Sequence, residues 1–132
     1  MLYQETTDKI IKAFYVVYNE LGYGFLEKVY ENSMFVELSS LGLKCKKQMP
    51  VNVYFKNERV GEYFADIIVD DKIIIELKAA ETIAVEHELQ LVNYLKATGI
   101  EVGLLLNFGK KPQFKRKIYT KKNNQCGSTK SA

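Results

Sequence analysis

The sequence is short of the residues from which many kinds of site are built. It has no tryptophan, one histidine, two cysteines and two prolines in 132 residues. The cysteines, Cys45 and Cys126, lie far apart, and with a single histidine they cannot supply the usual four ligands of a structural zinc ion. We therefore expect free thiols and no structural zinc.

Long apolar runs are missing as well. No segment approaches the roughly 18 apolar residues of a membrane-spanning helix, and residues 1–10 lack the basic and apolar stretches of a secretory signal. Hydrophobic residues still make up 47% of the chain and charged residues 27%, which is typical of globular proteins. We expect one domain over residues 1–120, located in the cytoplasm and without a membrane partner.

Acidic residues are absent from the last part of the chain. Residues 1–101 contain 11 basic and all 16 acidic side chains, whereas residues 102–132 contain 8 basic side chains. Lysine and arginine bind the phosphates of nucleic acids, but a basic terminus can also serve solubility alone. We expect residues 121–132 to form a disordered basic tail, which is compatible with a nucleic-acid partner without establishing one.

Hydrophobic spacing predicts an α/β fold with the order α-α-β-β-β-α-β. Helical periodicity, a cap at Thr6 or Thr7 and glycine stops predict helices at 8–21, 25–41 and 86–98. Alternating β-branched and aromatic residues predict strands at 48–55, 60–69, 73–77 and 102–106, with room for an edge strand at 114–119. A helix before the last of the main strands allows a right-handed crossover, so we expect a mixed central sheet flanked by helices.

Charged residues interrupt two of these apolar strands. Asp66 lies in one strand, Glu76 lies in the next, and Lys78 directly follows that second strand. If residues 70–72 form a three-residue loop, Asp66 lies directly across from Glu76. With a two-residue loop, Asp66 faces Ile75 instead, and the two carboxylates lie on opposite faces.

Two opposed carboxylates repel each other unless a cation lies between them or one of them is protonated. Oxygen ligands suit magnesium or manganese. A cation beside the ammonium group of Lys78 suits phosphodiester hydrolysis. The alternative is an ordinary ion pair of Asp66, Glu76 and Lys78 on an exposed hairpin.

Further polar residues fall on helix faces that carry apolar neighbours. The helical wheel places Glu27 along the centre of the apolar face of the second helix, where a neutral, hydrogen-bonded carboxyl is the alternative to a functional one. Gln90 and Tyr94 project together from the third helix and could hold a phosphate or a water. A core tyrosine and a loop-capping glutamine explain them equally well, and we do not expect His87 to be catalytic.

Residues 24–30, with the sequence GFLEKVY, match the signature that names the GxxExxY protein family, a branch of the PD-(D/E)XK nuclease superfamily. That superfamily has an αβββαβ, restriction-endonuclease-like core with Asp on the second strand and Glu-x-Lys on the third. Here Asp66 and the triplet at 76–78 resemble these motifs. The resemblance covers residues 8–119, and Ala65 stands where the superfamily's name has proline.

The resemblance implies a role for each candidate residue. It implies a Mg²⁺ or Mn²⁺ site whose ligands are Asp66, Glu76, the carbonyl oxygen of Leu77, and Glu27. Lys78 would act on the nucleophilic water. Gln90 and Tyr94 look like the Q-x-x-x-Y pair of the exonuclease-like branch and would bind substrate.

The sequence thus favours a magnesium-dependent nuclease acting on DNA. A module that keeps the fold and binds nucleic acid or protein without turnover is the alternative. A domain of this size presents little binding surface, so a homodimer or a partner protein is a further expectation.

Overall fold

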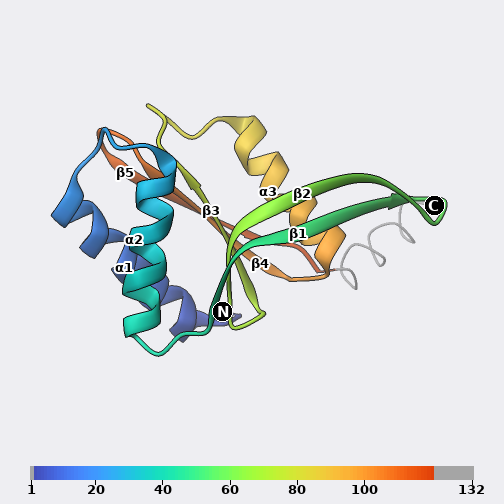
Figure 1. The fold of residues 1–132 in the computed structure, drawn as a ribbon, viewed down its shortest axis with the longest axis horizontal. Helices are drawn as coiled ribbons and strands as arrows, with labels where there is room; N and C mark the ends of the chain where they lie inside the picture. Colours follow the sequence, from blue (N-terminus) through green and yellow to red (C-terminus); the bar gives the residue numbers. More distant parts are fainter. Residues whose placement is uncertain (1, 121–132) are drawn as a thin grey trace.

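The computed structural model of the chain describes residues 2–120, in which three helices surround a five-stranded sheet (Figure 1). The elements are α1 (Gln4–Leu21), α2 (Glu27–Ser40), β1 (Cys45–Phe55), β2 (Glu58–Val69), β3 (Ile73–Lys78), α3 (Val85–Thr98), β4 (Val102–Phe108) and β5 (Pro112–Ile118). The predicted α/β fold and element order are therefore confirmed, and β5 is the edge strand for which the sequence left room. The predicted tail at 121–132 lies outside the described residues.

The sheet has the order β1-β2-β3-β4-β5 and is mixed. β3 and β4 run parallel and are joined through α3, as predicted, whereas the other neighbouring strands are antiparallel. The hairpin between β2 and β3 has a three-residue loop, because Val69 pairs with Ile73 and two loop residues, Asp70 and Asp71, have left-handed backbone angles. This register was one of two alternatives, and it decides where Asp66 lies.

Two layers of side chains cover the sheet, one on each face. One core packs under α1 and α2, and its largest members are Phe14, Tyr30, Met34, Leu38, Ile75 and Phe108. A second, smaller core packs under α3, with members such as Ala65, Ile68, Ile74, Leu91, Tyr94 and Leu105. β3 and β4 are buried on both faces, which explains why their sequences are almost uninterrupted apolar runs.

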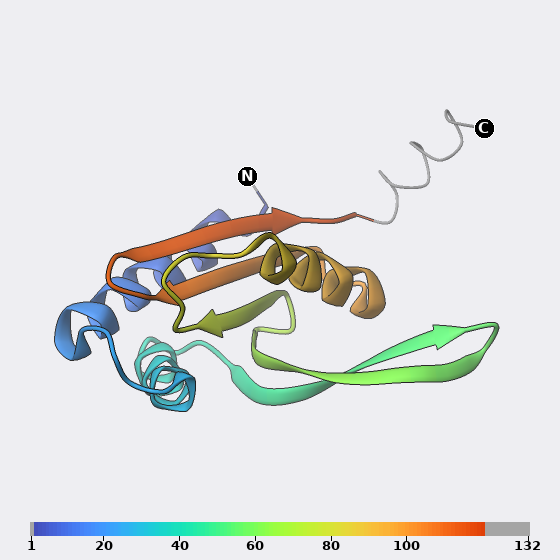
Figure 2. The same cartoon turned by 90° about the horizontal axis from the view of Figure 1, so that it is seen from above.

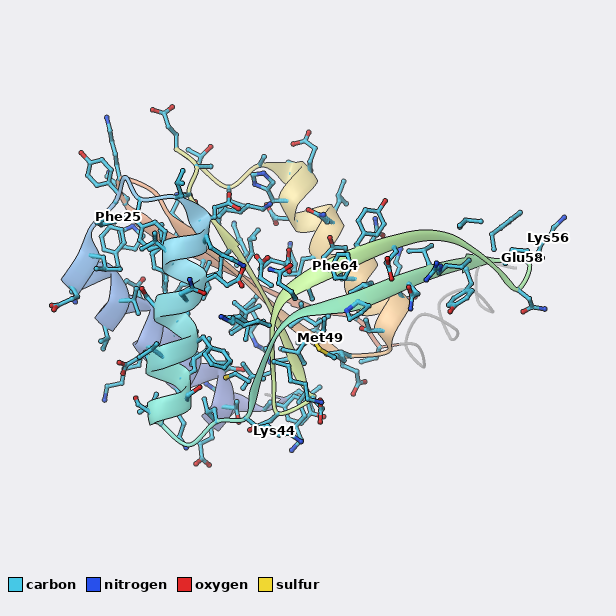
Figure 3. All side chains as sticks on the ribbon, in the orientation of Figure 1. Phe25, Lys44, Met49, Lys56, Glu58 and Phe64 are labelled. Carbon is cyan, nitrogen blue, oxygen red and sulfur yellow. The ribbon has the colours of Figure 1, made fainter. Side chains whose placement is uncertain are left out.

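The β1–β2 hairpin reaches well beyond the rest of the sheet (Figures 1 and 2). β1 and β2 have 11 and 12 residues, but β2 pairs with β3 only over residues 67–69. Lys56 and Glu58 lie at the tip of this arm, and Phe64 lies near the point where the arm leaves the body (Figure 3). In the distal arm, β1 and β2 therefore pair only with each other, and many of their residues are exposed.

The first two helices differ from prediction at their ends. α1 begins four residues earlier than predicted, after Tyr3, so that Thr6 and Thr7 lie inside the helix and do not cap it. α2 begins at Glu27 and ends at Ser40, shorter at both ends than predicted, which leaves Leu41 exposed. None of the helices within residues 2–120 is long and apolar enough to cross a membrane.

Candidate active site

Asp66 and Glu76 lie opposite each other on β2 and β3, as the three-residue loop predicts. The backbone N–H of Asp66 donates to Oε2 of Glu76 at 2.8 Å, and the backbone N–H of Leu77 donates to Oδ2 of Asp66 at 2.8 Å. Each carboxylate is thus fixed to the neighbouring strand. The reading of these residues as an exposed ion pair is wrong, because only 5% of Glu76 is exposed and Asp66 is half-buried.

The site raises the pKa of both carboxyl groups. Burial is the main cause for Glu76, and the negative charge of Asp66 adds to it, so that the pKa of Glu76 rises to about 8. Burial also raises the pKa of Asp66, partly offset by the hydrogen bond from Leu77. At neutral pH without a cation, the pair therefore holds a proton, which removes much of the repulsion.

A third carboxylate comes from α2, and it is Glu31. Its exposed fraction is 5%, and its negative charge raises the pKa of both Asp66 and Glu76. Nζ of Lys28 donates to its Oε2 at 3.3 Å. Glu31 was not among the residues predicted from the sequence, although it lies one helical turn after Glu27 and therefore on the same side of α2.

The prediction that Glu27 faces the core is wrong. Glu27 is exposed, and it is the first residue of α2. A helical wheel gives the direction of a side chain but does not say whether that turn of the helix packs against the rest of the protein. The first turn of α2 does not, and its residues are exposed. Buried residues begin at Tyr30 and Glu31. Glu31, and not Glu27, occupies the buried position on this side of α2.

Gln48 connects the carboxylates of two different elements. Its Nε2 donates to Oε1 of Glu31 at 2.8 Å and to Oδ1 of Asp66 at 3.4 Å. Gln48 lies within β1 but has a φ of 53°, and its neighbours Lys47 and Met49 pair with Ile67 and Ala65 while it pairs with none. A left-handed angle is costly for a residue other than glycine. This local distortion accompanies the placement of an amide donor between two carboxylates.

Lys78 and the end of β3 lie beside the pair. The charge of Lys78 lowers the pKa of both Asp66 and Glu76, and its side chain is half-buried. The chain directly after it is held by the buried Asn107, whose side chain accepts from the N–H of Ala80 and donates to the carbonyl of the same residue, both at 2.9 Å. Asn107 therefore fixes the segment that follows Lys78.

α3 contributes Gln90 and Tyr94, as predicted, side by side. Nε2 of Gln90 donates to the hydroxyl of Tyr94 at 2.7 Å. Burial raises the pKa of Tyr94 to about 12, and the charges of Glu76 and Asp66 add to the shift. The predicted pair is thus close enough to the carboxylates for their charges to act on Tyr94. His87 has a structural contact, because its Nδ1 accepts from the backbone N–H of Ala84 at the start of α3.

Tyr30, the last residue of the GFLEKVY segment, anchors the loop between α1 and α2. Its hydroxyl donates to the carbonyl of Gly22 at 2.7 Å and accepts from the N–H of Phe25 at 3.2 Å. Its ring is fully buried and stacks on Phe108 at 4.2 Å between centroids. Gly24 has a φ of 108° in the same loop, which favours glycine. These contacts fix the start of α2, and with it the position of Glu31.

The donors at this site suit a hard cation. No group of three or more His, Cys, Asp or Glu side chains within residues 2–120 is arranged closely enough to hold a metal by itself. Mg²⁺, however, keeps several waters and is usually bound through one or two carboxylates. Oε1 of Glu76 accepts no hydrogen bond from residues 2–120, so Asp66, Glu76 and the carbonyl of Leu77 offer oxygen ligands that fit the ion.

Comparison with known proteins bears on the fold and the family of the chain. No curated protein matches the sequence. The solved structure titled "Crystal structure of SSO0001" resembles the chain with a TM-score of 0.58 and 16% sequence identity, over 71% of this chain. The chain spans about half the length of that protein, since the match covers 50% of it. A likeness at this identity shows the fold alone.

A family model described as the PD-(D/E)XK nuclease superfamily matches residues 4–118. The match includes all five strands and α3, and therefore every element that carries Asp66, Glu76, Lys78, Gln90 and Tyr94. The mixed sheet flanked by three helices is accordingly a restriction-endonuclease-like fold, and the chain belongs to the PD-(D/E)XK nuclease superfamily.

Proposed function

We propose that this protein is a magnesium-dependent nuclease that hydrolyses phosphodiester bonds of DNA, and that it belongs to the GxxExxY branch of its superfamily. The observation that carries the proposal is the pair formed by the half-buried Asp66 and the buried Glu76, whose mutual repulsion gives no benefit to the fold by itself. A third carboxylate, Glu31, and the ammonium group of Lys78 stand beside the pair.

Asp66, Glu76 and the carbonyl of Leu77 would hold Mg²⁺ or Mn²⁺. When bound, such an ion supplies polarisation of the phosphoryl oxygen and a lower pKa for a water molecule. Lys78 orients the attacking water and stabilises the negative charge that develops on the phosphate. Glu31, buried on α2, and Glu27, exposed one turn earlier, are the remaining acidic residues of the proposed metal site.

Residues around these groups hold them in place. Gln48 bridges Glu31 and Asp66 by its amide, so the α2 carboxylate and the β2 carboxylate keep a fixed relation. Gln90 and Tyr94 offer an amide and a hydroxyl to a substrate phosphate from the α3 side. The carboxyl of Glu76 keeps a proton at neutral pH until a cation replaces it, which limits repulsion in the free protein.

We propose a cytoplasmic protein that meets DNA there, with the basic residues after position 101 as phosphate contacts. A domain of this size covers only a short stretch of duplex. We therefore propose that a second copy or a partner protein takes part in engaging longer substrates.

The test is cleavage of labelled DNA and RNA, single- and double-stranded, in Mg²⁺ or Mn²⁺. Glu76→Gln should remove cleavage because it removes a ligand while preserving the shape of the side chain. Lys78→Gln should lower the rate by a factor of about 100 or more. Glu58→Gln, the same change at the exposed tip of the hairpin, is the matched control and should cleave like the unaltered protein.

Cleavage that survives Glu76→Gln would contradict the assignment of the site. A folded protein that cleaves none of the four substrates would favour the alternative of a binding module without turnover.

A further inference from the structure

A groove lies between the projecting β1–β2 hairpin and α3. Its volume is about 750 Å³. One wall comes from the hairpin, through residues 52–54 and Tyr63, and the other from α3, through residues such as Asn93 and Lys96. The groove is therefore formed where the long hairpin extends over the helix, and it exists because β1 and β2 continue past their pairing with β3.

The lining of this groove combines flat rings with amide groups. Three tyrosines contribute, of which Tyr54 is 62% exposed and Tyr63 is 49% exposed. The rings of Tyr63 and Tyr94 lie 5.7 Å apart between centroids, tilted by 43°. Aromatic rings exposed in this way stack on the faces of unpaired nucleobases, whatever the base.

Amide side chains line the same groove as the rings. Asn52, Asn93 and Gln90 line the groove, and Oδ1 of Asn52 has no hydrogen-bond partner within residues 2–120. Asparagine and glutamine amides pair with the edges of bases, which carry both donors and acceptors. Glu86 and Lys96 balance each other in charge, so the groove interior repels neither a base nor a sugar.

The groove shares two residues with the candidate active site. Gln90 and Tyr94 line the groove, and the hydroxyl of Tyr94 is close enough to Glu76 and Asp66 for their charges to raise its pKa. A strand lying in the groove would therefore present its next phosphate to the carboxylates. The arrangement connects a surface for base faces with a site suited to a phosphodiester bond.

We propose that this groove binds the unpaired bases of a single DNA strand and guides that strand into the carboxylate site. This inference rests on the proposed nuclease function, and it specifies the substrate as single-stranded or locally unpaired. The bases of a duplex stack on one another and offer no free faces to the tyrosines. A second copy of the chain, packing its own hairpin into the groove, is the competing occupant.

Binding without cleavage tests the proposal. In EDTA, fluorescence anisotropy measures the affinity for a labelled single strand of about 12 nucleotides and for the matching duplex and RNA. We expect the single DNA strand to bind more tightly than the duplex. Tyr63→Ala and Tyr54→Ala should each weaken single-strand binding about tenfold. Tyr63→Phe and Tyr54→Phe, which keep the rings, should bind like the unaltered protein.

Two controls make the result specific. Tyr23→Ala removes an exposed tyrosine from the loop between α1 and α2, away from the hairpin, and should leave binding unchanged. A 2-aminopurine placed in the strand should lose fluorescence on binding, and Tyr54→Ala should reduce that loss. Tyr54 is the variant of choice if Tyr63→Ala unfolds, because it has the greater exposure.

Several outcomes would overturn the proposal. They are equal binding of strand and duplex, equal loss in the phenylalanine variants, a preference for RNA, or a dimer in light scattering that the tyrosine variants dissociate. Tyrosine-dependent strand binding without cleavage in Mg²⁺ would support the groove and contradict the nuclease. Cleavage of duplex that is indifferent to Tyr54 and Tyr63 would support the nuclease and contradict the groove.

Discussion

The two faces of the sheet have the same strands behind them but very different contents. Under α1 and α2, the buried residues are apolar apart from Thr7, the anchoring hydroxyl of Tyr30, and Glu31, whose carboxylate accepts a hydrogen bond from Gln48 of the candidate site. On the face under α3, the apolar cluster is half as large and stands beside Asp66, Glu76 and a groove. We call the face under α1 and α2 the closed face, because apolar side chains fill it, and the face under α3 the open side, because it carries the groove.

This difference separates the residues that stabilise the fold from those that cost stability. Burying a charged or protonated carboxyl beside another gains nothing for folding, whereas each buried ring on the closed face contributes to it. The apolar core under α1 and α2 therefore supplies the stability that permits the carboxylates of the candidate site. We therefore expect substitutions in the apolar core to change the free energy of unfolding, and substitutions among the carboxylates to change its pH dependence and cation binding.

The largest expected effect is on the closed face. Phe108→Ala should lower the free energy of unfolding by about 3–5 kcal/mol, because Phe108 is 1% exposed and packs its ring against Phe14 and Tyr30. Phe64→Ala, at a site that is 47% exposed on the hairpin, is the matched control. It should cost less than about 1 kcal/mol. Equal losses in urea unfolding would remove the distinction between the two regions.

The next effect is a pH dependence that arises on the open side. The pKa of Glu76 is about 8 in the folded protein and near 4.5 when the chain is unfolded. The folded state thus binds this proton more tightly, and the resulting stabilisation is complete below about pH 4.5 and is lost as the pH rises through about 8. In EDTA, the unaltered protein should lose a few kcal/mol of unfolding free energy over this range.

Glu76→Gln carries no titrating group at this position, so its unfolding free energy should change less between pH 5 and pH 9 than that of the unaltered protein. At pH 9 the variant should be the more stable of the two in EDTA. A variant that is less stable than the unaltered protein at pH 9 would show that Glu76 stabilises the fold, contrary to the account.

Glu31 and Glu27 provide a sharper comparison within one helix. Glu31→Gln should weaken Mn²⁺ binding about tenfold, because a buried negative charge beside the proposed ligands is lost. Glu27→Gln, one turn earlier and exposed, should weaken it less. Isothermal titration of both variants measures the difference. A larger loss at Glu27 would restore the prediction made from the helical wheel.

The smallest expected effect concerns the backbone at Gln48. Gln48→Gly and Gln48→Ala both remove the amide that bridges Glu31 and Asp66, but only glycine relieves the left-handed angle of 53°. The glycine variant should be more stable than the alanine variant by about 1 kcal/mol. Both should bind Mn²⁺ more weakly than the unaltered protein does. Equal stability of the two in thermal unfolding would show that this angle is not strained.

Much of the fold could be predicted because local signals agreed with it. The turn residues at 70–72 and the β-branched strands on either side place Asp66 opposite Glu76 once a three-residue loop is chosen. The glycine at position 99 ends α3 in a left-handed conformation, as its position after a helical stretch indicates. These features depend on a few neighbouring residues, and such residues are visible in a sequence.

The parts of the site that sequence reasoning missed depend on depth and on distorted backbone. A helical wheel cannot distinguish Glu27 from Glu31, because both lie on one side of α2. Only the packing of the helix in the folded protein buries Glu31 and leaves Glu27 exposed. The four-residue spacing was a signal that could have indicated Glu31. Nothing local indicated Gln48, because its role depends on a left-handed angle in the middle of β1.

The central claim is that Asp66 and Glu76 form a divalent-cation site, and calorimetric titration tests it most directly. Mg²⁺ and Mn²⁺ should bind the unaltered protein with one site per chain, and binding should release protons into the buffer because Glu76 must ionise. Asp66→Asn should remove the binding while the variant keeps its circular dichroism spectrum. Unchanged binding by Asp66→Asn, or no binding by the unaltered protein even with DNA present, would contradict the account.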